Sequence, residues 1–302
     1  MVIVVVLLLL VAYIYIAKNP TVLEKIPSKQ PEPTPTTPII ITGDTIKVAA
    51  FNLQIFGTTK ADKPEVMEVL SKTIRNYDVI AVQEIRDSSQ TALPLLRDTV
   101  NSRGSPQYDY VVSERLGRTA SKEQYAYIFN TQTIQVMGTP YAYPDSTDMF
   151  QREPYVSEFK AKNGNFDFVL ITIHTDPDTA TQEINDLPKV IEDAKSKYQG
   201  EGDFIVLGDL NADCGYFNEN SQSPLRSSEY FWVINNSVDT TTKSTDCTYD
   251  RIIISNPAKT DFTGEAGVFR FDMAYNLTYD NTIAVSDHYP VYAVFWSYRD
   301  ND

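Results

Sequence analysis

The sequence predicts an α/β protein in which two packed β-sheets carry helices on their outer faces. Two observations support this prediction: short apolar runs of strand length alternate with polar segments from residue 46 to residue 295, and only a few segments have helical spacing. Many strands with few helices bury their apolar faces as sheet packed on sheet, with the helices outside. A chain of 302 residues has room for one large domain or two small ones.

The expected strands are short and mostly apolar. They cover residues 46–51, 79–83, 108–112, 125–129, 156–159, 166–173, 204–207, 251–254 and 291–295. The spacing of apolar residues predicts helices over 64–76, 89–101, 179–197 and 224–234. In the first helix one face carries Val66, Val69, Leu70, Thr73 and Ile74.

The N-terminal part of the chain does not have the pattern of a folded domain. Residues 2–17 form an uninterrupted apolar run of sixteen, close to the short limit of about 17–25 residues for a membrane span. No basic segment precedes the run and no small-residue cleavage site is clear, which favours a transmembrane anchor over a signal segment for residues 1–17. Residues 18–43 hold six prolines and are predicted to be a Pro-rich linker. The folded domain is expected over 44–302.

Charge and cysteine content limit the partners and the compartment. The net charge is −14, so the surface repels nucleic acid and anionic membranes unless a cation or a local arginine intervenes. Cys214 and Cys247 are expected to be buried thiols in a cytosolic protein and a single disulfide in an exported one. Lysines that follow the apolar run weakly favour a cytoplasmic domain.

The stretch 203–214 is the centre of the site prediction. Residues 204–207 are apolar and are expected to form a buried strand that ends at Gly208. Asp209 and Asn211 follow, two residues apart and therefore on the same side of an extended chain. Their carboxylate and carboxamide oxygens suit a hard divalent cation, although such a turn is often only a turn.

Other expected strands also have a polar or titratable residue at one end. These residues are Asn52, Glu84, His174, Asp250 and the pair Asp287-His288. Functional side chains are commonly held where a rigid strand meets a solvent-facing loop. The same placement in so many elements therefore predicts one shared cleft.

The chain contains only two histidines, His174 and His288. Histidine titrates near neutral pH, so one imidazole can activate water while the other protonates a leaving alkoxide. Each needs a carboxylate to fix its tautomer, and Glu123 and Asp250 are the candidates. Beside a divalent cation that neutralises phosphoryl oxygens, this set can hydrolyse a phosphodiester. A zinc site is disfavoured, because the two histidines are far apart in sequence and the cysteines lack C-x-x-C spacing.

These residues, in this order, resemble the deoxyribonuclease I branch of the endonuclease/exonuclease/phosphatase superfamily. The resemblance spans residues 46 to 295 and rests on segments 50–52, 83–87, 112–118, 122–123, 152–154, 208–214, 247–251 and 286–290. Gly-Asp-x-Asn at 208–211 and Ser-Asp-His at 286–288 belong to the whole superfamily, whereas Arg118, Glu123, Arg152 and the two cysteines are more specific to the branch. The resemblance implies a four-layer sandwich of two mixed sheets between helices.

The resemblance also implies roles for individual residues. The implied catalytic pairs are Glu123 with His174 and Asp250 with His288. The implied holders of Mg²⁺ or Mn²⁺ and the scissile phosphate are Asn52, Glu84, Asp209, Asn211 and Asp287. The implied DNA-binding residues are Arg86, Arg118, Arg152 and Tyr249. The implied ligands of structural Ca²⁺ are Asp239, Thr241 and Thr245 on one loop, and Asp145, Asp148, Phe150 and Glu153 on another.

The resemblance further pairs Cys214 with Cys247 in a disulfide, which favours the extracellular side. The domain would then be anchored to the membrane through residues 2–17, or secreted if the leader is cleaved. Two residues depart from the family pattern: Ser121 stands where the family has a minor-groove tyrosine, and Lys243 interrupts the first calcium loop.

The function expected from the sequence is a divalent-metal-dependent endonuclease. It would cut double-stranded DNA with little sequence specificity, leave 5′-phosphate ends and act as a monomer. Two alternatives remain at this point. One is a sister phosphodiesterase or phosphatase that acts on lipid or inositol phosphates, and the other is a non-catalytic surface binding protein.

Overall fold

The computed structural model describes residues 44–301. The expected membrane segment and the whole Pro-rich linker lie outside these residues, so both stay predictions. Within the described part of the chain, no helix has the length and apolar character needed to cross a membrane.

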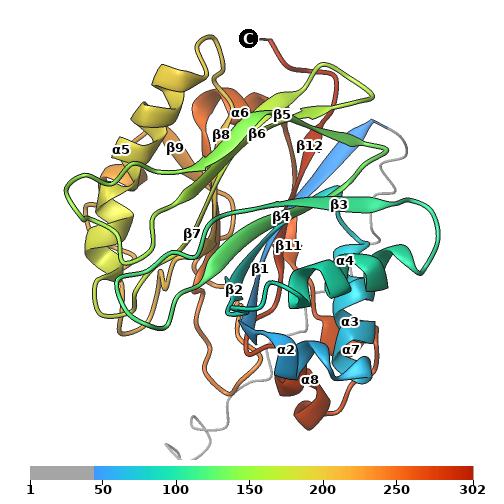
Figure 1. Ribbon diagram of the computed structural model, residues 1–302. Coiled ribbons are helices and arrows are strands. Elements are labelled where there is room, and N and C mark those ends of the chain that lie inside the picture. The colour runs from blue at the N-terminus through green and yellow to red at the C-terminus, as the bar shows by residue number, and fades with distance from the viewer. Residues whose placement is uncertain (1–43, 302) are drawn as a thin grey trace, which may run out of the picture. The chain divides into compact units, whose positions relative to one another are not determined.

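Two six-stranded mixed sheets form the centre of the molecule (Figure 1). The first sheet has the order β11-β12-β1-β2-β4-β3, and the second has the order β5-β6-β7-β8-β10-β9. The strands of the first sheet are β1 (Thr45–Phe56), β2 (Val79–Ile85), β3 (Tyr108–Val112), β4 (Gln124–Asn130), β11 (Phe262–Val268) and β12 (Val291–Trp296). The strands of the second are β5 (Ile134–Ala142), β6 (Tyr155–Ala161), β7 (Asp167–His174), β8 (Phe204–Asp209), β9 (Tyr230–Trp232) and β10 (Asp250–Ser255).

Helices cover the outer faces of both sheets. The first sheet is covered by α2 (Thr58–Ala61), α3 (Pro64–Ile74), α4 (Ala92–Asn101), α7 (Phe271–Ala274) and α8 (Tyr279–Val285). The second is covered by the long helix α5 (Ala180–Lys197), and the short α6 (Asn256–Asp261) follows β10. Figure 1 shows α5 on one side of the paired sheets and α2, α3 and α4 on the other. This arrangement confirms the predicted four-layer sandwich.

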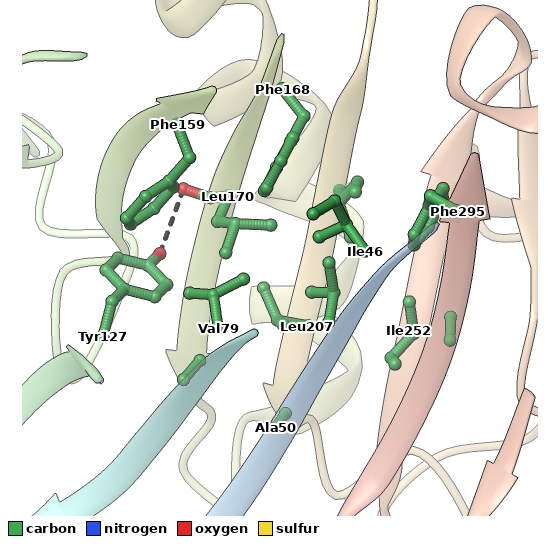
Figure 2. Close-up of a cluster of buried hydrophobic side chains, with 14 of the residues drawn as sticks. Ile46, Ala50, Val79, Tyr127, Phe159, Phe168, Leu170, Leu207, Ile252 and Phe295 are labelled. Carbon is green, nitrogen blue, oxygen red and sulfur yellow. Dashed lines mark hydrogen bonds between the residues drawn. The ribbon is translucent and has the colours of Figure 1, made fainter. Parts of the chain in front are cut away.

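The main core lies between the two sheets. In β1, alternate residues point to opposite faces, so Val48 and Ala50 enter the core between the sheets. Ala49 and Phe51 enter the core beneath α3 and α4 instead. Both faces of the strand are therefore buried, which explains its continuous apolar run. Figure 2 shows side chains from both sheets meeting in the inter-sheet core.

The structure adds three strands that the sequence did not reveal. All three (β5, β9 and β11) are at or near sheet edges, where one side of the strand is unpaired. Gly138 and Gly264 adopt positive φ inside β5 and β11, and the pairing register shifts in both strands. Glycine and an irregular register weaken the alternating pattern that marks a strand.

The predicted helix over 224–234 is wrong. The chain forms a single 3₁₀ turn at Pro224–Arg226 and then the edge strand β9, which pairs with β10. Trp232 donates its indole N–H to the carbonyl of Leu225 at 2.8 Å and stacks on Phe217. These long-range contacts outweigh the local helical spacing. The other three predicted helices are confirmed as α3, α4 and α5, with ends shifted by a few residues.

Candidate active site

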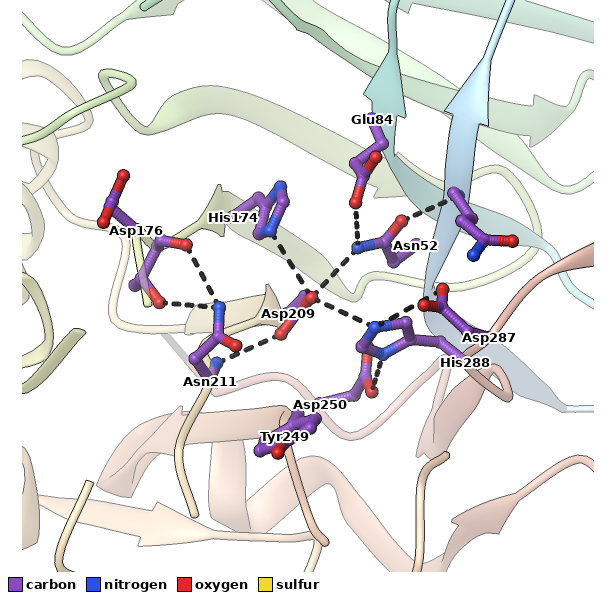
Figure 3. Close-up of polar contacts among 12 residues, drawn as sticks. Asn52, Glu84, His174, Asp176, Asp209, Asn211, Tyr249, Asp250, Asp287 and His288 are labelled. Carbon is purple, nitrogen blue, oxygen red and sulfur yellow. Dashed lines mark hydrogen bonds and ion pairs between the residues drawn. The ribbon is translucent and has the colours of Figure 1, made fainter. Parts of the chain in front are cut away.

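Strand pairing brings the predicted site residues together. β7 and β8 are parallel, and their register places His174 beside Asp209. β10 runs antiparallel to β8, and its register places Asp250 opposite the same aspartate. Side chains from the ends of three neighbouring strands of the second sheet therefore meet, as Figure 3 shows.

Gly208 allows this close approach of β7 and β8. Its φ is +141°, and a Cβ atom at this position would lie 2.1 Å from the carbonyl oxygen of Ile173. A larger residue would push the two strands apart, because backbone atoms cannot yield as a flexible side chain can. The glycine thus fixes Asp209 next to the end of β7.

The two histidines have mirror-image hydrogen-bonding patterns. Nδ1 of His174 lies 2.9 Å from Oε2 of Glu123, and Nδ1 of His288 lies 2.8 Å from Oδ2 of Asp250. The Nε2 atoms of both histidines face Oδ2 of Asp209, at 3.5 Å and 3.4 Å. Each imidazole is therefore braced by its own acid on one side and faces a common carboxylate on the other. Figure 3 shows both rings facing Asp209, and His288 beside Asp250.

Charged neighbours control the protonation of both pairs. Burial alone lowers the pKa of His288, but Asp250, Asp209 and Asp287 outweigh it and raise this pKa to about 10. Burial also lowers the pKa of His174, and its hydrogen bond to Glu123 and the charge of Asp209 produce a net rise. His288 is accordingly cationic at neutral pH before any metal ion binds, and the rise in the pKa of His174 favours its cationic form in the same state.

Burial and hydrogen bonds act in opposite directions on Glu123. Burial raises the pKa of its carboxyl group, but the hydrogen bond to His174 and the positive charges of His174, Arg152 and Arg86 lower it to about 2. Glu123 is therefore ionised throughout the neutral range and can hold one tautomer of His174.

The predicted metal-holding residues lie around Asp209. Asn52 donates from Nδ2 to Glu84 at 3.1 Å and to Asp209 at 2.9 Å. Asn211 donates its backbone N–H to Oδ1 of Asp209 and its amide to the carbonyl of Thr175. Asp287 lies beside His288, with its Oδ1 3.9 Å from Nε2 of the imidazole.

The donor set fits a hard divalent cation. Glu84, Asp209, Asn211, Asp287 and both histidines line one cleft of about 310 Å³. Single ligand atoms of Asp209, Asp250 and His288 lie within 4.8 Å of one another. Carboxylate and amide oxygens predominate, which suits Mg²⁺ or Mn²⁺ better than a soft metal.

Comparison with known proteins agrees with this geometry. A model of the endonuclease/exonuclease/phosphatase family matches residues 49–288. Deoxyribonuclease-1 of Bos taurus is 37% identical over 260 residues, which covers 82% of this chain and 92% of that protein. Deoxyribonuclease gamma of Mus musculus is 38% identical over 259 residues, covering 82% and 83%.

The chain is a deoxyribonuclease I-like member of the endonuclease/exonuclease/phosphatase family. Solved structures of more distant proteins share the fold. The human nocturnin catalytic domain has a TM-score of 0.60 at 15% identity and covers 83% of this chain and 93% of its own. A family protein from Bacteroides thetaiotaomicron has a TM-score of 0.57 at 16% identity, covering 85% and 98%.

Three of the four residues that the family resemblance assigned to DNA are at least partly exposed. Arg86 is half-buried and pairs with Glu123 at 2.7 Å and Glu84 at 3.3 Å. Arg118 is exposed and pairs with Asp148. Tyr249 lines the cleft and packs beside His288 with ring centroids 6.2 Å apart.

Arg152 is buried, whereas a residue that contacts DNA is expected at the surface. It is only 7% exposed. Its guanidinium donates to the carbonyl oxygen of His174 at 3.1 and 3.0 Å and to that of Thr175 at 3.2 Å, and it lies 3.4 Å from Glu123. In the structure Arg152 supports His174 and Glu123 beneath the cleft, and its contact with DNA stays a prediction.

The first predicted calcium loop is assembled in the structure. Thr241 donates its backbone N–H and its hydroxyl to Oδ1 of Asp239, at 2.9 and 2.8 Å, and its hydroxyl also contacts Thr245. The nearby disulfide joins Cys214 and Cys247, as the resemblance implied.

The second predicted calcium loop is assembled only in part. Asp145 accepts the backbone N–H of Phe150 at 2.8 Å, and its carbonyl accepts that of Asp148. The carboxylate of Asp148 is paired with Arg118. Among the described residues, Glu153 makes no hydrogen bond or ion pair with this loop.

Sequence reasoning missed one supporting residue of the site. The hydroxyl of Tyr125 accepts the backbone N–H of His174 at 3.0 Å and is fully buried between the sheets. Tyr125 lies in β4 two positions after Glu123, which directly precedes the strand in an isolated β-bridge, so the spacing predicts that both side chains point to the same face. That spacing is the signal that could have identified it.

Proposed function

We propose that this protein is a divalent-metal-dependent endonuclease that hydrolyses phosphodiester bonds in double-stranded DNA and leaves 5′-phosphate ends. The observation that carries the proposal is the convergence of the two acid-braced histidines on Asp209. The family membership and the deoxyribonuclease names of the relatives support DNA as the substrate.

The site residues can carry out the two proton transfers of hydrolysis. One imidazole removes a proton from the attacking water, and the other gives a proton to the leaving 3′-oxygen. Glu123 and Asp250 hold the Nδ1–H of the two rings, so that each Nε2 faces the cleft. A bound Mg²⁺ or Mn²⁺ would neutralise the phosphoryl oxygens. The residues that would hold it are Asn52, Glu84, Asp209, Asn211 and Asp287.

Little sequence specificity is expected. The residues that would contact DNA are Tyr249 in the cleft lining, Arg86 beside Glu84 and the exposed Arg118. A guanidinium or phenol hydroxyl contacts phosphate and sugar without reading base edges. Ser121 is exposed and accepts a hydrogen bond from Arg86 at 3.3 Å. A serine offers no aromatic ring to a base step, so preference among steps should be weak.

The site of action proposed for the domain is outside the cell. The disulfide between Cys214 and Cys247 supports this proposal, because such bonds persist in oxidising compartments. Residues 2–17 would anchor it to the membrane unless they are cleaved. We also propose that the domain binds structural Ca²⁺ at the loop of Asp239, Thr241 and Thr245, and that it acts as a monomer.

Nicking of supercoiled plasmid tests the proposed activity. We expect activity that disappears in EDTA, returns with Mg²⁺ or Mn²⁺, and is lost by at least about a hundredfold in His174→Ala, since general acid–base groups contribute about that much or more. Unchanged cutting by that variant would refute the mechanism. Parallel assays with sphingomyelin and a phosphoinositide test the alternative of a sister phosphodiesterase. If either lipid were hydrolysed and plasmid were not nicked, the substrate would be that lipid and not DNA.

A further inference from the structure

Lys243 brings a positive charge into the acidic cleft. Its Nζ lies 2.9 Å from Oδ2 of Asp287, one of the residues that would hold the metal ion. The lysine side chain is 52% exposed, so its ammonium group faces the solvent side of the cleft. Among the described residues that line this cleft, it is the only lysine or arginine.

The backbone around Lys243 is fixed against the strand-end segment that carries Asp287. Thr242 donates its N–H to the carbonyl of Asp287 and its hydroxyl to the carbonyl of Ser286, both at 2.9 Å. Thr241 forms a β-bridge with His288. Lys243 is therefore held at the mouth of the site by the same contacts that position Asp287 and His288, and its place does not depend on its own ion pair.

The charge balance of the cleft gives this lysine a role. Three carboxylates (Glu84, Asp209 and Asp287) face the space where a DNA phosphate must bind, in a protein with a net charge of −14. A polyanion approaching such a surface is repelled unless local cations compensate. If Asp287 bound a divalent cation, the ammonium of Lys243 would lose its partner, while the contacts of Thr242 would still hold the backbone in place.

We propose that Lys243 is a substrate-binding residue whose ammonium group passes from Asp287 to a backbone phosphate of the DNA when the metal-loaded site engages its substrate. This inference rests on the proposed nuclease function. It assigns a phosphate contact to the residue that departs from the family pattern in the first calcium loop. A point charge on a flexible stem suits that contact, because it needs no fixed bidentate geometry.

The test compares DNA binding by variants in the His174→Ala background, in which DNA cleavage is expected to be lost. Lys243→Gln removes the charge and Lys243→Arg retains it. Lys197→Gln is the matched control, because Lys197 also pairs with an aspartate at 2.9 Å, is 40% exposed and lies at the far end of α5 from the cleft. Fluorescence anisotropy with one labelled duplex in Mg²⁺ gives the dissociation constant at each salt concentration.

We expect Lys243→Gln to weaken DNA binding several-fold and to reduce the slope of log affinity against log salt by about 1, the effect of one lost phosphate contact. Lys243→Arg should restore most of the slope, and Lys197→Gln should leave it unchanged. With His174 intact, Lys243→Gln should raise KM for plasmid and change kcat little.

Two results would overturn the inference while leaving the nuclease function intact. One is plasmid nicking by the parent together with an unchanged salt slope in Lys243→Gln. The other is unchanged DNA binding with a lower Mg²⁺ requirement in that variant, which would make Lys243 a competitor of the metal ion. A parent protein that neither binds nor nicks DNA would refute the proposed function itself, and the inference with it.

Discussion

Asp250 lies directly opposite Asp209 in the antiparallel pair of β8 and β10. Both residues are buried, and one ligand atom of each lies within 4.8 Å of the other. Two buried like charges at this separation repel each other strongly, because the protein interior screens them poorly. His288 contacts both, at 2.8 Å from Asp250 and 3.4 Å from Asp209, and its cation compensates them.

Replacing His288 by alanine is therefore expected to destabilise the metal-free protein by about 3–5 kcal/mol at pH 7, since it leaves buried carboxylates uncompensated. The folded-state pKa of His288 is raised from 6.5 to about 10. Its contribution is therefore fully present below pH 6.5 and is lost as the pH rises through about 10. Urea unfolding of parent and variant in EDTA measures the difference, and a difference that stays constant over this pH range would contradict the prediction.

Gly208→Ala is expected to lower the free energy of unfolding by more than about 2 kcal/mol and to abolish most activity. The new Cβ would meet the carbonyl of Ile173 at 2.1 Å, at a φ that side chains rarely adopt. Separating β7 from β8 also moves Asp209 away from His174. Gly215→Ala is the control, because its Cβ meets nothing within 4 Å and the change should stay within about 0.5 kcal/mol. If the two variants lost stability and activity equally, Gly208 would not be required for the close approach of β7 and β8.

Loss of the disulfide should destabilise the domain by about 3–4 kcal/mol, the chain-entropy estimate for a sequence separation of 33. The double variant Cys214→Ser, Cys247→Ser tests this in denaturant unfolding. The reduced parent should unfold at the same denaturant concentration as the double variant. A loss below about 1 kcal/mol would mean that other contacts, such as the 2.7 Å bond from the N–H of Thr248 to Asp213, already close this loop.

The inter-sheet core and most of the site were predictable because their signals are local. A run such as 204–207 shows its burial in its own composition, and Asp209 and Asn211 follow it directly. The edge strands β5 and β11 were not predictable, because glycine and register shifts interrupt their alternation. Periodicity tells which residues are buried but not which partner they meet. The contact between Lys243 and Asp287 and the burial of Arg152 depend on such partners.

The position of Arg152 leads to the last prediction, which separates support of the catalytic pair from contact with DNA. Arg152→Ala should lower kcat and leave DNA affinity in the His174→Ala background nearly unchanged, because its guanidinium bonds to His174 and Thr175 below the cleft. It should also cost about 1–3 kcal/mol of stability, since the buried carbonyls lose their donor.

Arg118→Ala is the matched comparison, because this arginine is exposed and, within residues 44–301, pairs with Asp148 alone. It should raise KM and weaken DNA binding while kcat and stability stay close to those of the parent. Removal of Arg152 also takes away a positive charge that helps to lower the pKa of Glu123. The acidic limb of the pH–rate profile should consequently move to higher pH in Arg152→Ala but not in Arg118→Ala. If Arg152→Ala instead raised KM with kcat, stability and pH profile intact, its guanidinium would have to turn to DNA in the complex, and the supporting role would be wrong.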